Sequence, residues 1–413
     1  MNDPTAVDEG LWRELAPQTL ARLLRTYGSD QFDLCEDAVQ DALLDAHRQW
    51  ATEPPRDPQA WLTATARRRY VDRVRRDVRR RDREGHVSML QAPLDHEPAT
   101  SDQPAATDDA LRLLQLCCHP ELPRSGQVAL TLRAVAGLTT AQIANAYQVP
   151  EATIAQRITR AKRRLTEAGG GFPRPTDVDE RMAPVLDVLY VMFTEAHHTT
   201  SGAPARDADL AAEAIHLARL LRRAAPESTE VAGILALMLL TEARHPARVG
   251  SRGRLIPLDE QDRTNWDRNL VDEGLELLDT VTPGATPGAY LLQACIAGVH
   301  ARASDTESTD WQEIHALYTV LEHTTGGRNP TITLNRIVAQ AMLQGNDRAL
   351  AALDELSSAH PDLARLDAVR AHLLERAGRI DEAGAAYQRA IKATLNVAEQ
   401  RHLRDRLRRL SGG

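Results

Sequence analysis

Residues 138–165 predict two short helices joined by a tight turn, and this pattern constrains the fold of the 413-residue chain more than any other. Thr139 and Thr140 supply an N-cap before the first helix. Pro150 fits the opening of the second helix, where a missing N–H costs nothing. Apolar residues recur at helical spacing along one face of the second helix, and this face should be buried: Ile154, Ile158, Ala161 and Leu165. The stretch is typical of a helix-turn-helix.

The opposite face of the second helix carries donors and acceptors that suit base edges in a major groove: Thr153, Gln156, Arg157 and Arg160. Further basic side chains near its end suit phosphates: Lys162, Arg163 and Arg164. We interpret residues 151–165 as a recognition helix. An ordinary helical hairpin with a solvated basic face is the alternative.

Composition predicts an all-α protein, because strong helix formers dominate and β-branched runs are few. The net charge of −8 is mild, so any nucleic-acid binding depends on local basic patches. The four cysteines are irregularly spaced, which argues against a disulfide framework. Cys117, Cys118 and His119 follow one another directly, whereas metal ligands are usually separated by other residues. We therefore expect buried thiols and no metal.

The N-terminus has no signal-like apolar region, and the longest apolar run, residues 231–240, is too short to span a bilayer. We therefore expect a cytoplasmic protein that does not bind membranes. The chain divides into residues 8–84, an acidic flexible linker at 85–107, a second helical domain at 108–168, a linker at 169–178 and a helical region at 179–411.

In the first domain, the sequence pattern predicts helices at residues 11–27, 32–50 and 59–84. The second of them has an acidic and polar face that is a candidate protein-docking surface, with a solvated face as the alternative: Asp37, Gln40, Asp41 and Leu44. The third carries ten arginines and four acidic residues between positions 67 and 84. It also has an apolar face that can pack on the core. Trp61 and Tyr70 there suit either base stacking or the core.

The region after residue 178 predicts ten helices, at 181–195, 209–224, 228–244, 261–280, 289–303, 311–322, 330–344, 347–358, 363–377 and 380–394. Near its end, Ala349, Leu353 and Leu356 recur 34 residues later as Ala383, Tyr387 and Ala390. A 34-residue period of helix pairs is the tetratricopeptide spacing.

Three motifs resemble the extracytoplasmic-function class of bacterial RNA polymerase sigma factors. EDAVQDALLDAHRQW is similar to the family's EDLVQDVFLRAW, and QAWLTATARRRYVDRVRR to WLxxIARNxxxDxLRR, with Arg68 at the position of Asn. Residues 138–165 are similar to SxxEIAxxLGxPxGTVxSRLxRARxxL. LCCHPEL, VPEATIAQR and EQDRTNWDR are similar to a subgroup with a tetratricopeptide-like C-terminal extension.

The resemblance implies a non-enzymatic protein without a cofactor that binds core RNA polymerase, through the largest-subunit clamp and the flap, and promoter DNA. Asp37, Gln40, Asp41 and Leu44 would face the polymerase. The separated −10 element would contact Trp61, Arg67, Arg68, Asp72, Arg75, Arg76 and Arg79. The −35 element would contact Thr153, Gln156, Arg157, Arg160, Lys162, Arg163 and Arg164. The extension is either a built-in regulator or a docking surface required for activity, and a regulatory protein is a candidate partner there.

Two other classes of function stay open at this point. A conventional DNA-binding regulator with a helical-repeat sensor would explain the helix-turn-helix but not the first domain. An enzyme in the C-terminal region would use Glu195, His197 and His198 as a metal or acid–base cluster. The two adjacent histidines point in different directions on a helix, and the sequence places no further metal ligand beside them. Residues 260–263 are interpreted as a helix start with a buried ion pair.

Overall fold

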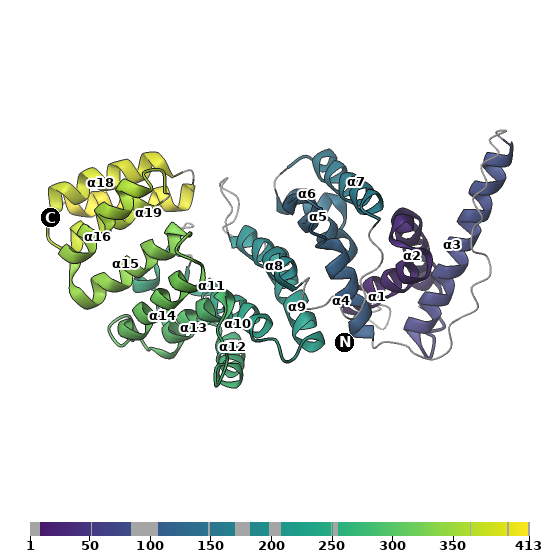
Figure 1. The fold of residues 1–413 in the computed structure, drawn as a ribbon, viewed down its shortest axis with the longest axis horizontal. Helices are drawn as coiled ribbons and strands as arrows, with labels where there is room; N and C mark the ends of the chain where they lie inside the picture. The colour runs from purple at the N-terminus through teal and green to yellow at the C-terminus, as the bar shows by residue number, and fades with distance from the viewer. Residues whose placement is uncertain are drawn as a thin grey trace. The chain divides into compact units, whose positions relative to one another are not determined.

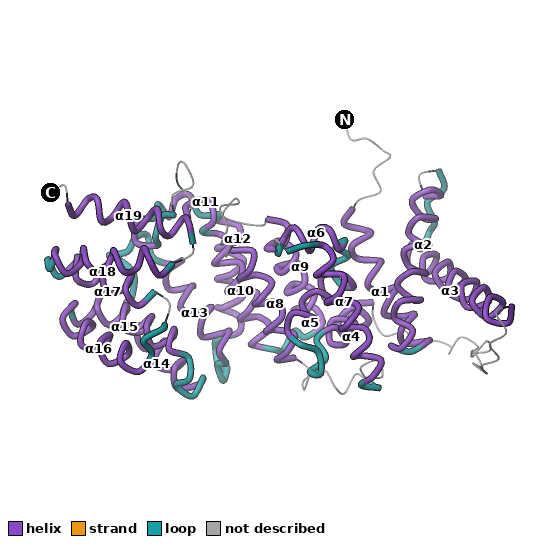
Figure 2. The backbone as a smooth tube through the Cα atoms, turned by 90° about the horizontal axis from the view of Figure 1, so that it is seen from above, coloured by secondary structure: helices purple, strands orange, loops and turns teal. Residues whose placement is uncertain are grey.

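The structure, a computed structural model, describes residues 9–50, 52–83, 106–147, 149–169, 182–197, 208–248, 250, 255–363, 365–394 and 396–411. Within these ranges helices are joined by loops without a β-strand, so the all-α prediction is confirmed (Figures 1 and 2). The chain forms two compact units, Met1–Met192 and Phe193–Gly413, which divide inside α8 (Met182–His197). In the part of the chain described, no helix combines the length and apolarity that crossing a membrane needs.

The first three helices of the N-terminal unit pack on one another and are α1 (Glu9–Tyr27), α2 (Phe32–Trp50) and α3 (Pro58–Arg83), with the short turn η1 (Ser29–Gln31) before α2. Aromatic side chains lock this packing. Trp12 stacks on Trp50 with ring centroids 4.8 Å apart, and Tyr27 stacks on Tyr70 at 3.8 Å. Tyr70 is therefore a core residue, whereas Trp61 is half-exposed.

Four further helices follow in the same unit: α4 (Ala106–Cys117), α5 (Arg124–Ala134), α6 (Thr140–Ala146) and α7 (Glu151–Glu167). Thr139 caps α6, because its hydroxyl accepts from the Gln142 N–H at 3.2 Å while the Gln142 side chain accepts from the Thr139 N–H at 2.8 Å. Cys117 and Cys118 are buried, as predicted. The predicted linker, 85–107, lies outside the described residues over 85–105, and its last two residues belong to α4.

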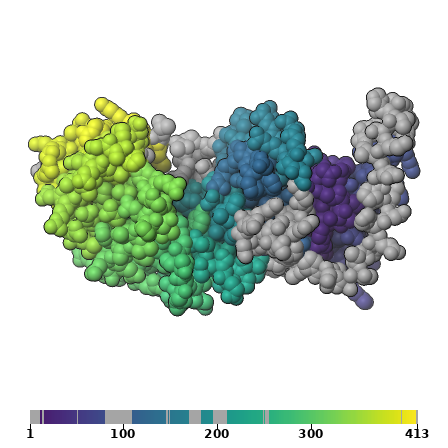
Figure 3. All heavy atoms as spheres, viewed as in Figure 1, coloured from purple at the N-terminus to yellow at the C-terminus, as the bar shows by residue number. Residues whose placement is uncertain are grey.

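The C-terminal unit is built from helices that continue the chain in order: α9 (Ala208–Ala224), α10 (Thr229–Ala243), α11 (His245–Arg248), α12 (Arg268–Val281), α13 (Ala289–Arg302), α14 (Trp311–Thr324), α15 (Pro330–Gln344), α16 (Asn346–Ala359), α17 (Leu366–Arg376), α18 (Ile380–Ala393) and α19 (Val397–Ser411). On the face that Figure 3 shows, the atoms of its closing helices, coloured green to yellow, form one continuous surface. The predicted helix at 261–280 is too long at its start. Residues 258–265 instead form two turns, η4 (Leu258–Glu260) and η5 (Arg263–Asn265), because Asp267 caps α12 through the N–H groups of Asn269 and Leu270.

Helix α10 of the C-terminal unit packs against α9, α12 and α13. Its approach to α13 is so close that a Cβ on Gly233 would stand 2.6 Å from the backbone N and Cα of Leu291. Glu230 fixes the same contact, because its carboxylate accepts from the N–H groups of Tyr290 at 3.0 Å and Leu291 at 2.9 Å. These are N–H groups at the start of α13, which have no partner within their own helix.

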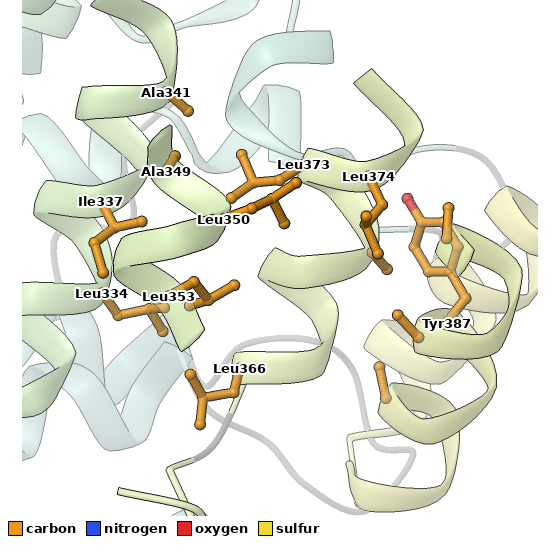
Figure 4. Packing of buried hydrophobic residues seen from close by; sticks show 14 of the residues in the cluster. Leu334, Ile337, Ala341, Ala349, Leu350, Leu353, Leu366, Leu373, Leu374 and Tyr387 are labelled. Carbon is orange, nitrogen blue, oxygen red and sulfur yellow. The ribbon is translucent and has the colours of Figure 1, made fainter. Parts of the chain in front are cut away.

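The last helices share one apolar cluster. Two of these helices, α16 and α18, begin 34 residues apart in the sequence. The predicted repeat positions on these two helices are all buried in this cluster: Ala349, Leu353, Leu356, Ala383, Tyr387 and Ala390. Leu334 of α15 faces Leu353 of α16, and Tyr387 lies next to Leu374 of α17 (Figure 4). The Tyr387 hydroxyl lies 2.5 Å from a carboxylate oxygen of Glu375. The assignment to tetratricopeptide repeats itself stays a prediction.

Replacing Gly233 with alanine should destabilise the C-terminal unit by about 1–3 kcal/mol or more, because the new methyl group has no room against the α13 backbone. Differential scanning calorimetry of the full chain measures the change. Gly384→Ala is the matched control, since its Cβ would meet Leu407 at an ordinary 3.7 Å and helix propensity favours alanine by about 1 kcal/mol. Equal unfolding temperatures for Gly233→Ala and the unmodified chain would contradict the close approach.

Candidate nucleic-acid interface

Helix α7 separates a buried face from a polar one, as predicted. Its buried side chains are those of the predicted face: Ile154, Ile158, Ala161 and Leu165. On the other face, Gln156 and Arg160 are exposed, and Thr153 and Arg157 are half-exposed. No side-chain hydrogen bond or ion pair joins Gln156, Arg157 or Arg160 to another described residue. Their donors and acceptors are therefore open to a ligand.

The three basic residues that follow differ from one another. Lys162 turns away from the exposed face and lies 2.6 Å from Asp33 and 2.5 Å from Glu36, with its ammonium 5.1 Å from the centre of the Phe32 ring. Arg163 is exposed and pairs with Glu167 at 3.3 Å. Arg164 is exposed and donates to the Glu121 carbonyl at 3.5 Å. The structure thus places Lys162 apart from the other predicted phosphate contacts, because α2 offers it two carboxylates.

The Glu36 carboxylate joins α2 to both α5 and α7. Its Oε2 accepts from Lys162, and its Oε1 accepts from the Arg133 Nε at 2.6 Å. The side chain of Glu36 is 12% exposed and that of Lys162 is 13% exposed, so water screens this pair little. Burial lowers the pKa of Lys162, but Glu36 and Asp33 outweigh burial and the net pKa is raised. We call Glu36, Arg133 and Lys162 the carboxylate clasp.

A second ion-pair group ties α1 to α4. The buried Asp109 accepts from Arg22 at 3.2 Å and from Arg25 at 2.8 Å. Burial raises the pKa of the Asp109 carboxyl, although Arg25 and Arg22 act in the opposite direction. The two halves of the N-terminal unit, α1–α3 and α4–α7, are thus held together by charges that neither half neutralises alone.

The predicted docking face of α2 combines ordered acids with an exposed apolar side chain. Leu44 is 56% exposed, which is unusual for a large apolar residue in this molecule. Asp37 and Asp41 both accept from Arg73 of α3, at 2.8 Å each. One turn further on, Asp45 pairs with Arg69. These pairs fix the acids while leaving Asp37 and Asp41 partly open to solvent.

An open cleft of about 570 Å³ lies between the end of α2 and the first half of α3. Seven residues line the cleft: Asp45, Arg48, Gln49, Trp61, Thr65, Arg68 and Arg69. Two of them, Trp61 and Arg68, are predicted −10 residues. Trp61 also meets Trp50 edge to face, with ring centroids 5.4 Å apart. The cleft therefore presents an aromatic ring, hydrogen-bonding groups and cations together.

The other predicted −10 residues lie outside the cleft lining. Arg75, Arg76 and Arg79 are exposed on the part of α3 that projects beyond α1 and α2 (Figure 1). Arg67 and Asp72 are half-buried. Sequence reasoning did not single out Arg48, Gln49 and Thr65. The i, i+4 spacing of Asp41 and Asp45 opposite Arg69 and Arg73 is a signal that predicts the α2–α3 ion pairs.

The alternative enzymatic residues receive no support from the side chains that are described. The side chains of Glu195 and His197, and all of His198, lie outside the described residues. Among the residues that are described, no three His, Cys, Asp or Glu side chains are grouped to hold a metal ion. Residues 260–263 do not begin a helix, since they lie in and between the turns η4 and η5; Glu260 forms an ion pair with Arg406 at 3.5 Å, and Arg263 binds carbonyl groups.

Comparison with known proteins covers most of the chain. Residues 12–80 match the Sigma-70 region 2 family, residues 114–165 match Sigma-70 region 4, and residues 181–282 match a family of unknown function, DUF6596. An uncharacterized protein of Rhizobium meliloti (strain 1021) is 39% identical, over 97% of this chain and 96% of that protein. The ECF RNA polymerase sigma factor SigK of Mycobacterium sp. (strain KMS) is 30% identical, over 33% of this chain and 69% of that protein. No solved structure matches the chain.

The chain belongs to the ECF RNA polymerase sigma factors and carries a large C-terminal helical unit in addition. Region 2 corresponds to α1–α3, and region 4 contains α5, α6 and the greater part of α7. This favours a sigma factor over a conventional regulator, for which the first three helices have no role.

Replacing Glu36 with glutamine should loosen the contact of α7 with α2, because Lys162 and Arg133 would then lack their shared carboxylate. Breaking a buried ion pair from one side typically costs about 3–5 kcal/mol. We expect faster amide hydrogen exchange in residues 151–167. Asp33→Asn is the control, because Asp33 is 81% exposed and an exposed pair contributes at most about 1 kcal/mol. Unchanged exchange in Glu36→Gln would contradict the clasp.

Proposed function

We propose that this chain directs bacterial core RNA polymerase to specific promoters and starts transcription there. The observation that carries the proposal is the exposed face of α7, where Gln156, Arg157 and Arg160 stand clear of the core on a helix that belongs to a region 4 domain. In this proposal α7 enters the major groove of the −35 element. The α1–α3 half binds the polymerase and the separated −10 element.

Base reading by α7 depends on side chains that are already oriented outward. A guanidinium placed against a guanine edge donates two hydrogen bonds, and each such bidentate contact contributes about 1–3 kcal/mol of base discrimination. Arg157 and Arg160 can act in this way, and Thr153 and Gln156 can bind other base edges. Arg163 and Arg164 would add affinity for phosphates with little discrimination.

The −10 element suits the cleft beside Trp61. A base can be read there only after it leaves the stack, and an aromatic ring offers it a new stacking partner. Trp61 provides the ring, while Arg68 provides charge for the backbone. Arg75, Arg76 and Arg79 would follow the strand along the projecting part of α3.

The carboxylate clasp gives the free protein a closed arrangement in this proposal. Lys162 cannot contact a phosphate while it lies 2.5 Å from Glu36. Use of Lys162 on the −35 element would therefore require the clasp to open, and DNA phosphates would replace the carboxylates. Promoter binding then competes with an interaction inside the N-terminal unit.

Arg157→Ala should lower transcription from the cognate promoter about tenfold or more, because it removes a base contact. Runoff transcription with core polymerase measures this effect, and a pull-down should show unchanged polymerase binding. Arg163→Ala is the matched control, since Arg163 already pairs with Glu167. This variant should lose affinity equally for all promoters. Loss of polymerase binding in Arg157→Ala would contradict the assignment of α7 to DNA.

Leu44→Asp should abolish polymerase binding in the same pull-down while α7 stays intact, because Leu44 is the exposed apolar anchor of the α2 face. Asp41→Arg should weaken binding too, but it also repels Arg73 inside the protein. Val78→Asp is the control, since Val78 is likewise an exposed apolar residue and lies on α3. Normal polymerase binding by Leu44→Asp would remove α2 from the interface.

The C-terminal unit is proposed to regulate the sigma factor through its tetratricopeptide-like helix pairs. Two roles fit such an extension, a built-in inhibitor and a surface required for activity, with a regulatory protein as a candidate partner. A chain that ends after Ala168 distinguishes the two roles in runoff transcription. Higher activity than that of the full chain identifies an inhibitor, and lower activity identifies a required surface.

A further inference from the structure

Two arginines of the C-terminal unit lie against one buried tryptophan and a third lies near one of them, and none of the three is bonded to a carboxylate among the described residues. We call Arg244, Arg248 and Arg263 the arginine cluster. The guanidinium carbons of Arg244 and Arg263 stand 5.6 Å and 5.5 Å from the ring centre of Trp266. Arg248 is an electrostatic neighbour of Arg244 at the end of α11. Positive charge is thus concentrated on half-buried side chains.

Arg263 has a structural role that accounts for part of its binding capacity. Its Nη1 donates to the carbonyl groups of His300 at 2.6 Å and Ala303 at 2.8 Å, and its Nη2 donates to the Thr309 hydroxyl at 3.0 Å. It therefore caps the end of α13, where carbonyl groups lack partners within the helix. Its Nε remains buried without a hydrogen-bond acceptor among the described residues.

Arg244 has no comparable role. Its side chain makes no hydrogen bond or ion pair with any residue that the structure describes, and its Nε is inaccessible to solvent. It follows α10 directly, so the partial negative charge of that helix end offsets some of its cost. Stacking on Trp266 adds a further favourable contribution. Neither interaction satisfies the N–H donors of the guanidinium.

Three buried N–H groups beside Trp266 have no acceptor among the described residues: Arg244 Nε, Arg263 Nε and Trp266 Nε1. Burial, together with Arg248 and Arg263, lowers the pKa of Arg244 to about 10, although Tyr318 acts in the opposite direction. Burial, together with Arg244 and Arg263, lowers the pKa of His300 to about 4, so this imidazole is neutral at pH 7. Asp305 is the acid that faces Arg263, and it is exposed.

We propose that the arginine cluster is a binding site for a small oxyanion, a phosphate or carboxylate group, within the C-terminal unit of this sigma factor. An oxyanion is the chemical complement of the site, because it carries negative charge and accepts hydrogen bonds only. It would neutralise Arg244 and Arg248 and give the buried donors acceptors. The ligand would bind without polymerase or DNA, so the site is independent of promoter recognition.

Titration calorimetry of the full chain with inorganic phosphate tests the site, with acetate as the carboxylate arm and chloride at equal ionic strength as the blank. We expect saturable binding of one of the two probes. Arg244→Gln and Arg248→Gln should each weaken it about tenfold or more, because each removes a charged hydrogen-bond donor. Arg223→Gln is the matched control, since Arg223 is exposed on α9 of the same unit and should leave binding unchanged.

Thermal unfolding without phosphate or acetate separates a ligand site from a merely structural arginine. Removal of an uncompensated buried charge should leave the unfolding temperature of Arg244→Gln equal to or above that of the unmodified chain. The bound anion should raise the unfolding temperature of the unmodified chain more than that of the variant. Absence of binding for both probes at millimolar concentration, or equal affinity in Arg244→Gln, would overturn the proposal.

Discussion

The Glu36 carboxylate is the interaction on which the arrangement of the N-terminal unit depends. Lys162 and Arg133 come from different helices of the region 4 half, and both reach one acid on α2 of the region 2 half. A buried ion pair contributes little net stability when complete, but removal of one partner leaves an uncompensated charge. The clasp therefore specifies which faces meet, and it hides a basic residue that would otherwise be open to phosphates.

The C-terminal unit depends on close packing instead. Gly233 lets the backbones of α10 and α13 approach, and Glu230 caps α13 at the same place. Further along, the helix pairs bury aliphatic side chains and Tyr387 in one cluster. The arginine cluster interrupts this pattern. Several other arginines of this unit pair with carboxylates, whereas Arg244 and Arg263 lie against Trp266 without one, and the capping role of Arg263 explains only one of them.

The periodic features were predictable from the sequence, and the long-range side-chain pairs were not. Helix α2 begins and ends where the pattern places it, and the buried face of α7 matches residue by residue, because a single apolar stripe at a 3.6 period fixes both. Lys162 looks the same in sequence whether it meets a phosphate or a carboxylate, and its partner lies 126 positions away. Helix α19 was missed because polar and charged residues make up most of it and its apolar stripe is narrow.

Co-elution of the full chain with purified bacterial core RNA polymerase is the decisive measurement for its role as a sigma factor. At micromolar concentration in gel filtration, we expect the chain to shift to the elution volume of the polymerase with a stoichiometry of one. A chain that elutes only at its own volume, with its fold intact by circular dichroism, is not a sigma factor for that polymerase.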